Sequence, residues 1–336
     1  MTFDRLLAIG LLAAAVVVAT APPALADPAV PTHYRSVVTE LDPAVEGMTI
    51  DVAGGDAFLV VAVAPGHHLD VPGYFAEPYL RIDADGTVWR NHHSPSRFIN
   101  ESRYGVEIPV EADPVAEADW RAVGNGGTYA WHDHRTHWMS RDLPPTIAGD
   151  RVQLVFPWEL EVVLDGEPVT VRGELVWLPA VNPVGPMLIG LGGLIPIAWW
   201  RRGRNTLLAV CLGALGAAAL LVATMQYLST PVDRAFPSEM ILPAVSVVLA
   251  IAAVGWRSSP IRATAARLLA AIALVIWGLS SRDVLTAPVL PSALPAVVER
   301  SLVALVLETA LVLAALIVVE RVRAERPVDR RRPTPA

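Results

Sequence analysis

The segment YAWHDHRTHWMS, residues 129 to 140, concentrates side chains that could bind a metal ion. It places His132, His134 and His137 within six positions and adds the thioether of Met139. Neutral imidazole is the commonest transition-metal ligand, and a mixed nitrogen and thioether set suits copper. We therefore predict a metal site formed by His132, His134, His137 and Met139. Copper is the favoured ion, and zinc is the alternative if three nitrogens and a water complete the site.

The backbone of this segment decides which of its histidines can share an ion. In a regular strand, side chains alternate between two faces, so His132 and His134 lie together and His137 points away. A three-histidine site therefore requires the chain to bend between Arg135 and His137. A type-one blue-copper centre is excluded because it needs a thiolate, and the only cysteine, Cys211, lies in an apolar segment far along the chain.

A structural role is the alternative hypothesis for the same segment. As a strand, it would pack the indoles of Trp131 and Trp138 in a core and pair Asp133 with Arg135 on the surface. Its histidines would then make ordinary hydrogen bonds. The sequence leaves the two hypotheses open.

The distribution of histidine favours a function for the N-terminal half. All eight histidines lie between residues 33 and 137, and residues 183 to 336 contain none. The pairs His67-His68 and His92-His93 occur in turn-like stretches, APGHHLD and RNHHSPS, and we expect them to be solvated loop residues. One member of a pair could still complete a metal site from another strand.

Hydrolytic chemistry is not favoured. The spacing His132-x-His134-x-x-His137 is similar to the H-x-H-x-D-H motif of the metallo-β-lactamase superfamily, but Thr136 stands where that motif has Asp. The helical layers that this superfamily implies have no counterpart in the sequence. The G-x-S-x-G elbow of serine hydrolases is also missing. We predict a protein that is not an enzyme.

Residues 27 to 182 are predicted to form an exported β-domain. Residues 1 to 26 have a basic start, an apolar run and the small-x-small sequence ALA, which together indicate a signal peptide. Asp85-Gly86 and Asp165-Gly166 each lie between alternating apolar runs and predict β-hairpins. Several short strands between Gly and Pro turns predict an extracytoplasmic, Ig-like β-sandwich of roughly seven to nine strands.

Residues 183 to 320 are predicted to cross the membrane five times, because each apolar run approaches the ~20 residues that span a bilayer. The predicted spans lie near residues 183 to 200, 206 to 228, 240 to 256, 264 to 281 and 301 to 320. The segments after spans one, three and five are rich in Arg. The positive-inside rule therefore places these segments and the C-terminus in the cytoplasm, and residues 27 to 182 outside.

The distribution of charged residues supports the division into a β-domain and a membrane domain. Residues 27 to 182 carry 24 acidic side chains against 10 Arg, whereas residues 183 to 336 carry 15 Arg against 8 acidic side chains. The Arg-rich tail, residues 321 to 336, is predicted to be disordered and to contact anionic lipid. Nucleic-acid binding is not expected, since the cluster adjoins a span and lacks aromatic residues.

Three segments of the outer domain resemble a group of uncharacterised actinobacterial multi-pass membrane proteins with an exported β-domain. They are the G-Y-x-x-E-P-Y-L-R stretch at residues 73 to 81, Ser94-Pro95, and W-H-D-H-R-x-H-W-M at residues 131 to 139. The resemblance covers most of the outer domain. It implies no activity, but it favours His132, His134 and His137 over the paired histidines.

The expected function is metal homeostasis at the cell membrane by a metal-binding, lipid-embedded protein, with a metal-handling or envelope protein as its expected partner. One alternative is a structural or partner-binding envelope protein without metal. A second is a cation or proton transporter that uses Glu308, an ionisable residue near the centre of span five.

Overall fold

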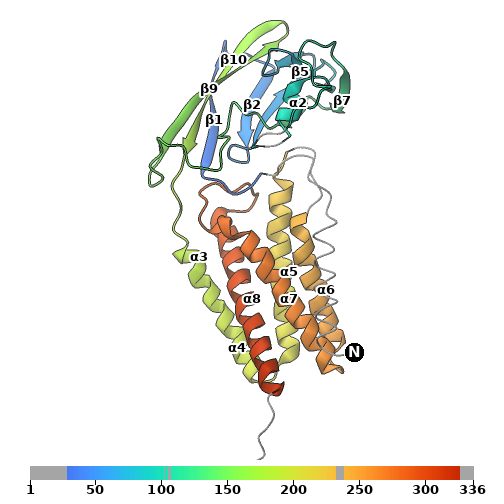
Figure 1. The fold of residues 1–336 in the computed structure, drawn as a ribbon, viewed down its shortest axis with the longest axis vertical. Helices are drawn as coiled ribbons and strands as arrows, with labels where there is room; N and C mark the ends of the chain where they lie inside the picture. The colour runs from blue at the N-terminus through green and yellow to red at the C-terminus, as the bar shows by residue number, and fades with distance from the viewer. Residues whose placement is uncertain (1–28, 102, 105–106, 232–237, 326–336) are drawn as a thin grey trace, which may run out of the picture.

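A computed structural model describes residues 29 to 101, 103 to 104, 107 to 231 and 238 to 325. The predicted signal peptide, residues 1 to 26, and most of the predicted tail lie outside these residues. The described chain forms a β-sheet domain that lies at one end of a bundle of long helices (Figure 1).

Ten strands form two antiparallel sheets within the described residues. The larger sheet has the order β1-β10-β9-β4-β5-β6-β7, and the smaller has the order β2-β3-β8. The strand bounds are β1 Tyr34–Asp42, β2 Met48–Ala53, β3 Phe58–Val63, β4 Leu69–Pro72, β5 Pro78–Ile82, β6 Val88–Asn91, β7 Trp120–Gly124, β8 Thr128–Trp131, β9 Gln153–Leu164 and β10 Glu167–Trp177. A short helix, α2 (Pro95–Ile99), lies between β6 and β7.

Both predicted Asp-Gly hairpins are confirmed. Asp85-Gly86 connects β5 to β6, and Asp165-Gly166 connects β9 to β10. Asp165 has a φ of 54° and Gly166 a φ of 87°, so both central residues of this turn take the positive φ that a tight two-residue hairpin requires. The turn sets the register of the longest hairpin, which pairs Leu164 with Glu167 and continues to Gln153 and Trp177.

The two sheets share one hydrophobic core. Leu59 and Val61 of the small sheet belong to the same buried cluster as Leu160, Val162 and Val171 of the large sheet. Leu160 and Val162 alternate with exposed residues along β9, which is the pattern of a strand with one buried face. The β-rich fold is therefore confirmed, and the Ig-like arrangement stays a prediction.

Among the described residues, five segments are helices long and apolar enough to cross a membrane, as predicted. Their bounds are Val184–Arg201, Asn205–Leu228, Ser238–Gly255, Pro260–Ser280 and Ala296–Val322. The first segment is not continuous: a 3-10 turn, η1 (Gly190–Gly193), separates α3 (Val184–Ile189) from α4 (Leu194–Arg201). The other four contain α5 (Asn205–Leu228), α6 (Ile241–Gly255) preceded by η2 (Ser238–Met240), α7 (Pro260–Ser280) and α8 (Ala296–Glu325).

The predicted fourth span contains one charged residue, Arg267. It is buried in α7, where its guanidinium donates to the Asn205 carbonyl (3.2 Å) and the Thr264 hydroxyl (2.9 Å). The last helix begins at Ala296 and continues to Glu325, so residues 321 to 325 are helical and the predicted disordered tail began too early. A partnered Arg can remain within an apolar helix, so Arg267 does not interrupt α7.

The β-domain contacts the bundle through the segment between α7 and α8. Thr32 and Val289 exchange backbone hydrogen bonds of 3.0 and 3.2 Å, and the Val181 amide donates to the Thr286 carbonyl at 2.9 Å. The 3-10 turn η3 (Arg282–Leu285) precedes this segment. The proline-rich stretch after α7 thus connects the two parts of the chain.

Candidate metal centre

The histidine segment is not a regular strand. Strand β8 ends at Trp131, and residues 132 to 140 follow without strand pairing. The chain therefore turns earlier than the predicted bend between Arg135 and His137, and the strand hypothesis for residues 132 to 138 was wrong. The structural reason is that Asp133 accepts hydrogen bonds from the turn that follows it.

Asp133 organises this turn. Its backbone carbonyl accepts from the amide (3.0 Å) and the hydroxyl (2.9 Å) of Thr136, which closes the turn. Its carboxylate accepts from the Trp131 indole at 2.9 Å and from the Arg135 guanidinium at 2.8 and 2.7 Å. Asp133 is fully buried, so the predicted Asp133–Arg135 pair exists but in the interior rather than on the surface.

The turn brings the three predicted histidines together. The ring centres of His134 and His137 are 5.1 Å apart, and those of His132 and His137 are 6.3 Å apart. With metal–nitrogen bonds of about 2.0 Å, two imidazole rings on one ion have centres roughly 5 to 6.5 Å apart. Across residues 29 to 325, outside the undescribed gaps, no three His, Cys, Asp or Glu side chains already surround a point that could hold a metal. A shared ion would require the rings to rotate, which the broad χ2 torsion of His permits.

His137 is the most unusual of the three. Its side chain is 1% exposed, and neither ring nitrogen has a hydrogen-bond partner among the described residues. Leaving a buried polar group without a partner costs about 1–3 kcal/mol. Most buried polar side chains in proteins are satisfied, and an unsatisfied one calls for an explanation such as an ion or a catalytic role. Burial, with smaller contributions from Arg103, His134 and His132, lowers the pKa of His137 to about 2.

This lowered pKa predicts a specific loss of stability in acid. Below about pH 6.5 the unfolded chain gains a proton at His137 that the folded chain does not take up. The free energy of unfolding should therefore fall as the pH drops from 6.5 towards 2, by up to about 1.4 kcal/mol per pH unit. The test compares unfolding of the parent and the His137→Leu variant at pH 7, 5.5 and 4.5. The parent should lose stability faster, and parallel curves would contradict the expectation.

The fourth predicted ligand lies at the surface. Met139 is 37% exposed, in contrast to the buried His132 and His137. Its role as a soft ligand stays a prediction. The remaining histidines lie in other places: His67, His68, His92 and His93 occupy loops, as predicted, and His33 stacks on Trp177 with ring centres 4.7 Å apart.

A buried ion pair, which the sequence analysis did not identify, lies next to the histidines. Asp56, 1% exposed, accepts from two nitrogens of Arg103, one at 3.1 Å. The ring of Phe58, two residues further on, lies 4.2 Å from that of His132. Asp56 and Arg103 are 47 positions apart, so no local pattern could have revealed the pair. The Gly-Gly-Asp turn between β2 and β3 was the only local signal.

The segments that carry the resemblance converge on this site. Tyr74 donates to the Asn100 carboxamide oxygen and accepts from the His134 amide at 2.8 Å. The Arg135 guanidinium lies 4.8 Å from the centre of the Tyr74 ring. Burial raises the pKa of the Tyr74 hydroxyl well above its usual range, so Tyr74 keeps its proton.

The second of these segments is held by a buried carboxylate. Glu77 is 3% exposed and accepts from the hydroxyls of Ser94 (2.5 Å) and Ser96 (2.7 Å). These contacts fix the start of α2 against the stretch that carries Tyr74. All three resemblance segments therefore belong to one polar network around the histidine turn.

The ionisable residues of the helical part lie far from this network in the sequence. Glu308, the predicted transport residue, packs against Gly190 in the break of the first apolar segment. Glu299 is more deeply buried: it is 0% exposed and accepts from the Gln226 amide at 2.7 Å. Glu299 precedes the predicted fifth span, residues 301 to 320, but in the structure it belongs to the first turns of α8.

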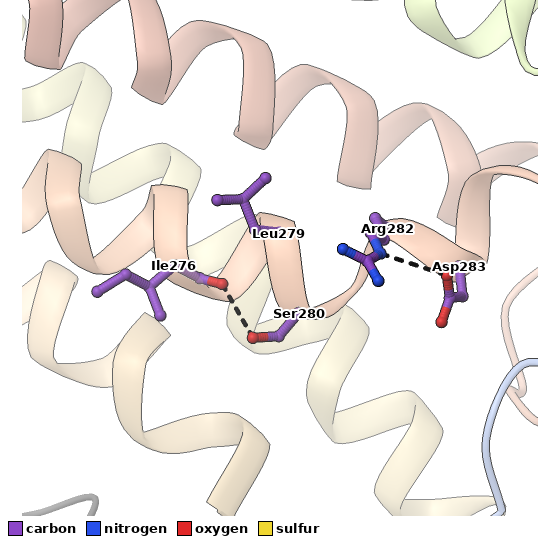
Figure 2. A pocket seen from close by; sticks show the side chains of 5 residues that line it. All are labelled: Ile276, Leu279, Ser280, Arg282 and Asp283. Atoms are coloured by element: carbon purple, nitrogen blue, oxygen red, sulfur yellow. Dashed lines mark hydrogen bonds and ion pairs between the residues drawn. The ribbon is translucent and has the colours of Figure 1, made fainter.

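A hollow of about 380 Å³ lies at the C-terminal end of α7 (Figure 2). It is lined by Ile276, Leu279, Ser280, Arg282 and Asp283. The Ser280 hydroxyl donates to the Ile276 carbonyl (3.0 Å), and Arg282 lies 3.6 Å from Asp283. Ile276 and Leu279 are exposed apolar residues of an apolar helix, so this hollow lies on the face expected to contact lipid and not at the histidine turn.

The histidine turn is thus a cluster of three imidazoles, of which those of His132 and His137 are buried, beside an ion pair and held by side chains from three separate segments. Comparison of the chain with protein-family models, curated proteins and solved structures found no match.

Proposed function

We propose that the β-domain binds a transition metal ion, copper foremost, at His132, His134 and His137 as part of metal homeostasis at the cell membrane. The observation that carries this proposal is the buried His137 ring, whose two nitrogens have no hydrogen-bond partner among the described residues, between two further imidazoles. A metal ion would give one of these nitrogens the partner that folding has not provided. The low pKa of His137 supports the proposal, since a ring must be neutral to bind metal.

Copper is preferred because the ligand set offers nitrogen and, from Met139, an adjacent thioether. Exposure of Met139 at the surface fits a site from which an ion can be exchanged with a partner protein. Zinc would suit the three nitrogens alone with a water molecule. The Asp56–Arg103 pair beside the site would hold His132 and the β2–β3 turn in place.

The proposal includes a topology. Residues 27 to 182 would form an extracytoplasmic, Ig-like sandwich, and the C-terminus would be cytoplasmic. Supporting this orientation, the Arg-rich segments follow the first, third and fifth apolar helices, so all of them lie on one side of a five-span bundle.

Equilibrium titration of the full-length protein in detergent with Cu²⁺, Cu⁺ and Zn²⁺ tests the proposal. The parent should bind one ion, and the His132→Ala/His134→Ala double variant should bind at least roughly 100-fold more weakly, since two metal–nitrogen bonds are lost. The His92→Ala/His93→Ala double variant removes the same number of imidazoles from a loop pair and should bind like the parent.

Three results would oppose the proposal. The parent binds no metal, or the two double variants bind metal equally well. In the third, His132→Ala/His134→Ala fails to fold and metal does not change the stability of the parent. The last result would support the structural or partner-binding alternative. A flux across vesicle membranes that Glu308→Gln abolishes would support the transport alternative.

A further inference from the structure

Three arginines gather at one edge of the large sheet. Arg90 on β6 and Arg121 on β7 are direct cross-strand partners. Arg97 lies on α2, the helix that connects these two strands along the chain. Strand β7 is the last strand of the sheet, and Figure 1 shows it beside α2 at the margin of the β-domain. Like charges placed directly opposite each other across two strands are destabilising.

Neighbouring carboxylates do not neutralise this group. Arg121 pairs with Asp119 at 2.7 Å, but neither Arg90 nor Arg97 forms an ion pair within 4.0 Å among the described residues. Among the described residues, the Nε atoms of Arg90 and Arg97 are buried and have no hydrogen-bond partner. A terminal nitrogen of Arg97 makes one long hydrogen bond, 3.5 Å, to the His92 carbonyl. Two guanidinium groups are therefore poorly satisfied in a domain that carries 24 acidic side chains and 10 Arg.

The electrostatic environment of His92 indicates that all three arginines lie near this histidine. After burial, the positive charges of Arg97, Arg121 and Arg90 lower the pKa of His92 to about 4, against a smaller opposing effect of Asp119. Burial and then Arg90 lower the pKa of Arg97 itself, although Glu101 and Glu111 act in the opposite direction. Such mutual repulsion is relieved when an anion lies between the charges.

We propose that Arg90, Arg97 and Arg121 form a binding site for a phosphate-type oxyanion. The guanidinium group donates from a planar fork that matches two oxygens of a phosphate group, and such charge-assisted bonds are among the strongest in proteins. The anion would satisfy Arg90 and Arg97 and would link β6, α2 and the edge strand β7. Its source is either free phosphate or a phosphodiester of an envelope polymer. The site is separate from the histidine turn and does not depend on metal binding.

Melting temperatures of the full-length protein in detergent, with chelator present, test the site. Inorganic phosphate should raise the melting temperature of the parent above that in chloride at equal ionic strength. Arg97→Gln and Arg90→Gln should each weaken phosphate affinity by roughly tenfold or more. Arg151→Gln makes the same charge change at an exposed position and should respond like the parent. Should either of these variants fail to fold, Arg121→Gln replaces it, because Arg121 is 60% exposed.

The proposal is overturned if phosphate gives the parent no rise beyond chloride, or if the arginine variants rise as much as the parent. A glycerol-phosphate oligomer in a parallel series identifies the source. Tighter binding of the oligomer than of inorganic phosphate supports an envelope polymer, and the reverse order supports free phosphate.

Discussion

A His137→Leu variant should keep or gain stability and should lose copper binding. Removing a buried imidazole without partners removes its desolvation penalty of about 1–3 kcal/mol. An imperfect fit of the leucine side chain offsets part of this gain, since reshaping a packed site typically costs about 1–3 kcal/mol. Unfolding of the metal-free protein and a copper titration measure the two effects. A functional residue is expected to show this combination, because sites for binding are often built at the expense of stability.

His33→Leu is the matched control for this variant. His33 stacks on Trp177, and its Nδ1 lies 3.1 Å from the Leu178 carbonyl. Its replacement should lower the free energy of unfolding by about 1 kcal/mol and should leave copper affinity unchanged. If His137→Leu instead destabilises the protein as much as His33→Leu and copper binding persists, the role of His137 is structural.

Local sequence signals predicted most of the fold. The Asp-Gly turns were identifiable because few residues accept positive φ, and the apolar helices because their length matches a bilayer. The end of the last helix was less predictable. Residues 321 to 325 extend it beyond the apolar run, and a polar helical extension carries no hydropathy signal.

The sequence identified the residues of the histidine site but not their arrangement in space. The spacing of His132, His134 and His137 identified the residues, while alternation along a strand would have separated His137 from the others. Their approach depends on the Asp133 turn, which is held by Tyr74, through the His134 amide, and by Trp131. Tyr74 is 60 positions from His134, so this contact has no signature in the local sequence. The Asp56–Arg103 pair was missed for the same reason.

Asp133→Asn should cause the largest loss of stability among the substitutions considered. The amide can accept through only one oxygen, whereas the carboxylate accepts from the Trp131 indole through Oδ2 and from Arg135 through both oxygens. The Arg135 guanidinium, 25% exposed, would lose its counter-charge. Breaking one partner of a buried ion pair costs about 3–5 kcal/mol. Chemical unfolding of the full-length protein measures this loss.

Glu159→Gln is the control for Asp133→Asn, because it breaks an exposed ion pair instead of a buried one. Glu159 accepts from Arg172 at 3.0 Å, as Asp133 accepts from Arg135, but Glu159 is 65% exposed and Arg172 also contacts Glu40 and Asp42. Its substitution should cost about 1 kcal/mol or less. Copper affinity should fall in Asp133→Asn, because the turn that returns His137 to His134 is weakened, and should not change in Glu159→Gln. Equal costs and equal affinities in the two variants would mean that the Asp133 turn does not hold the histidines together.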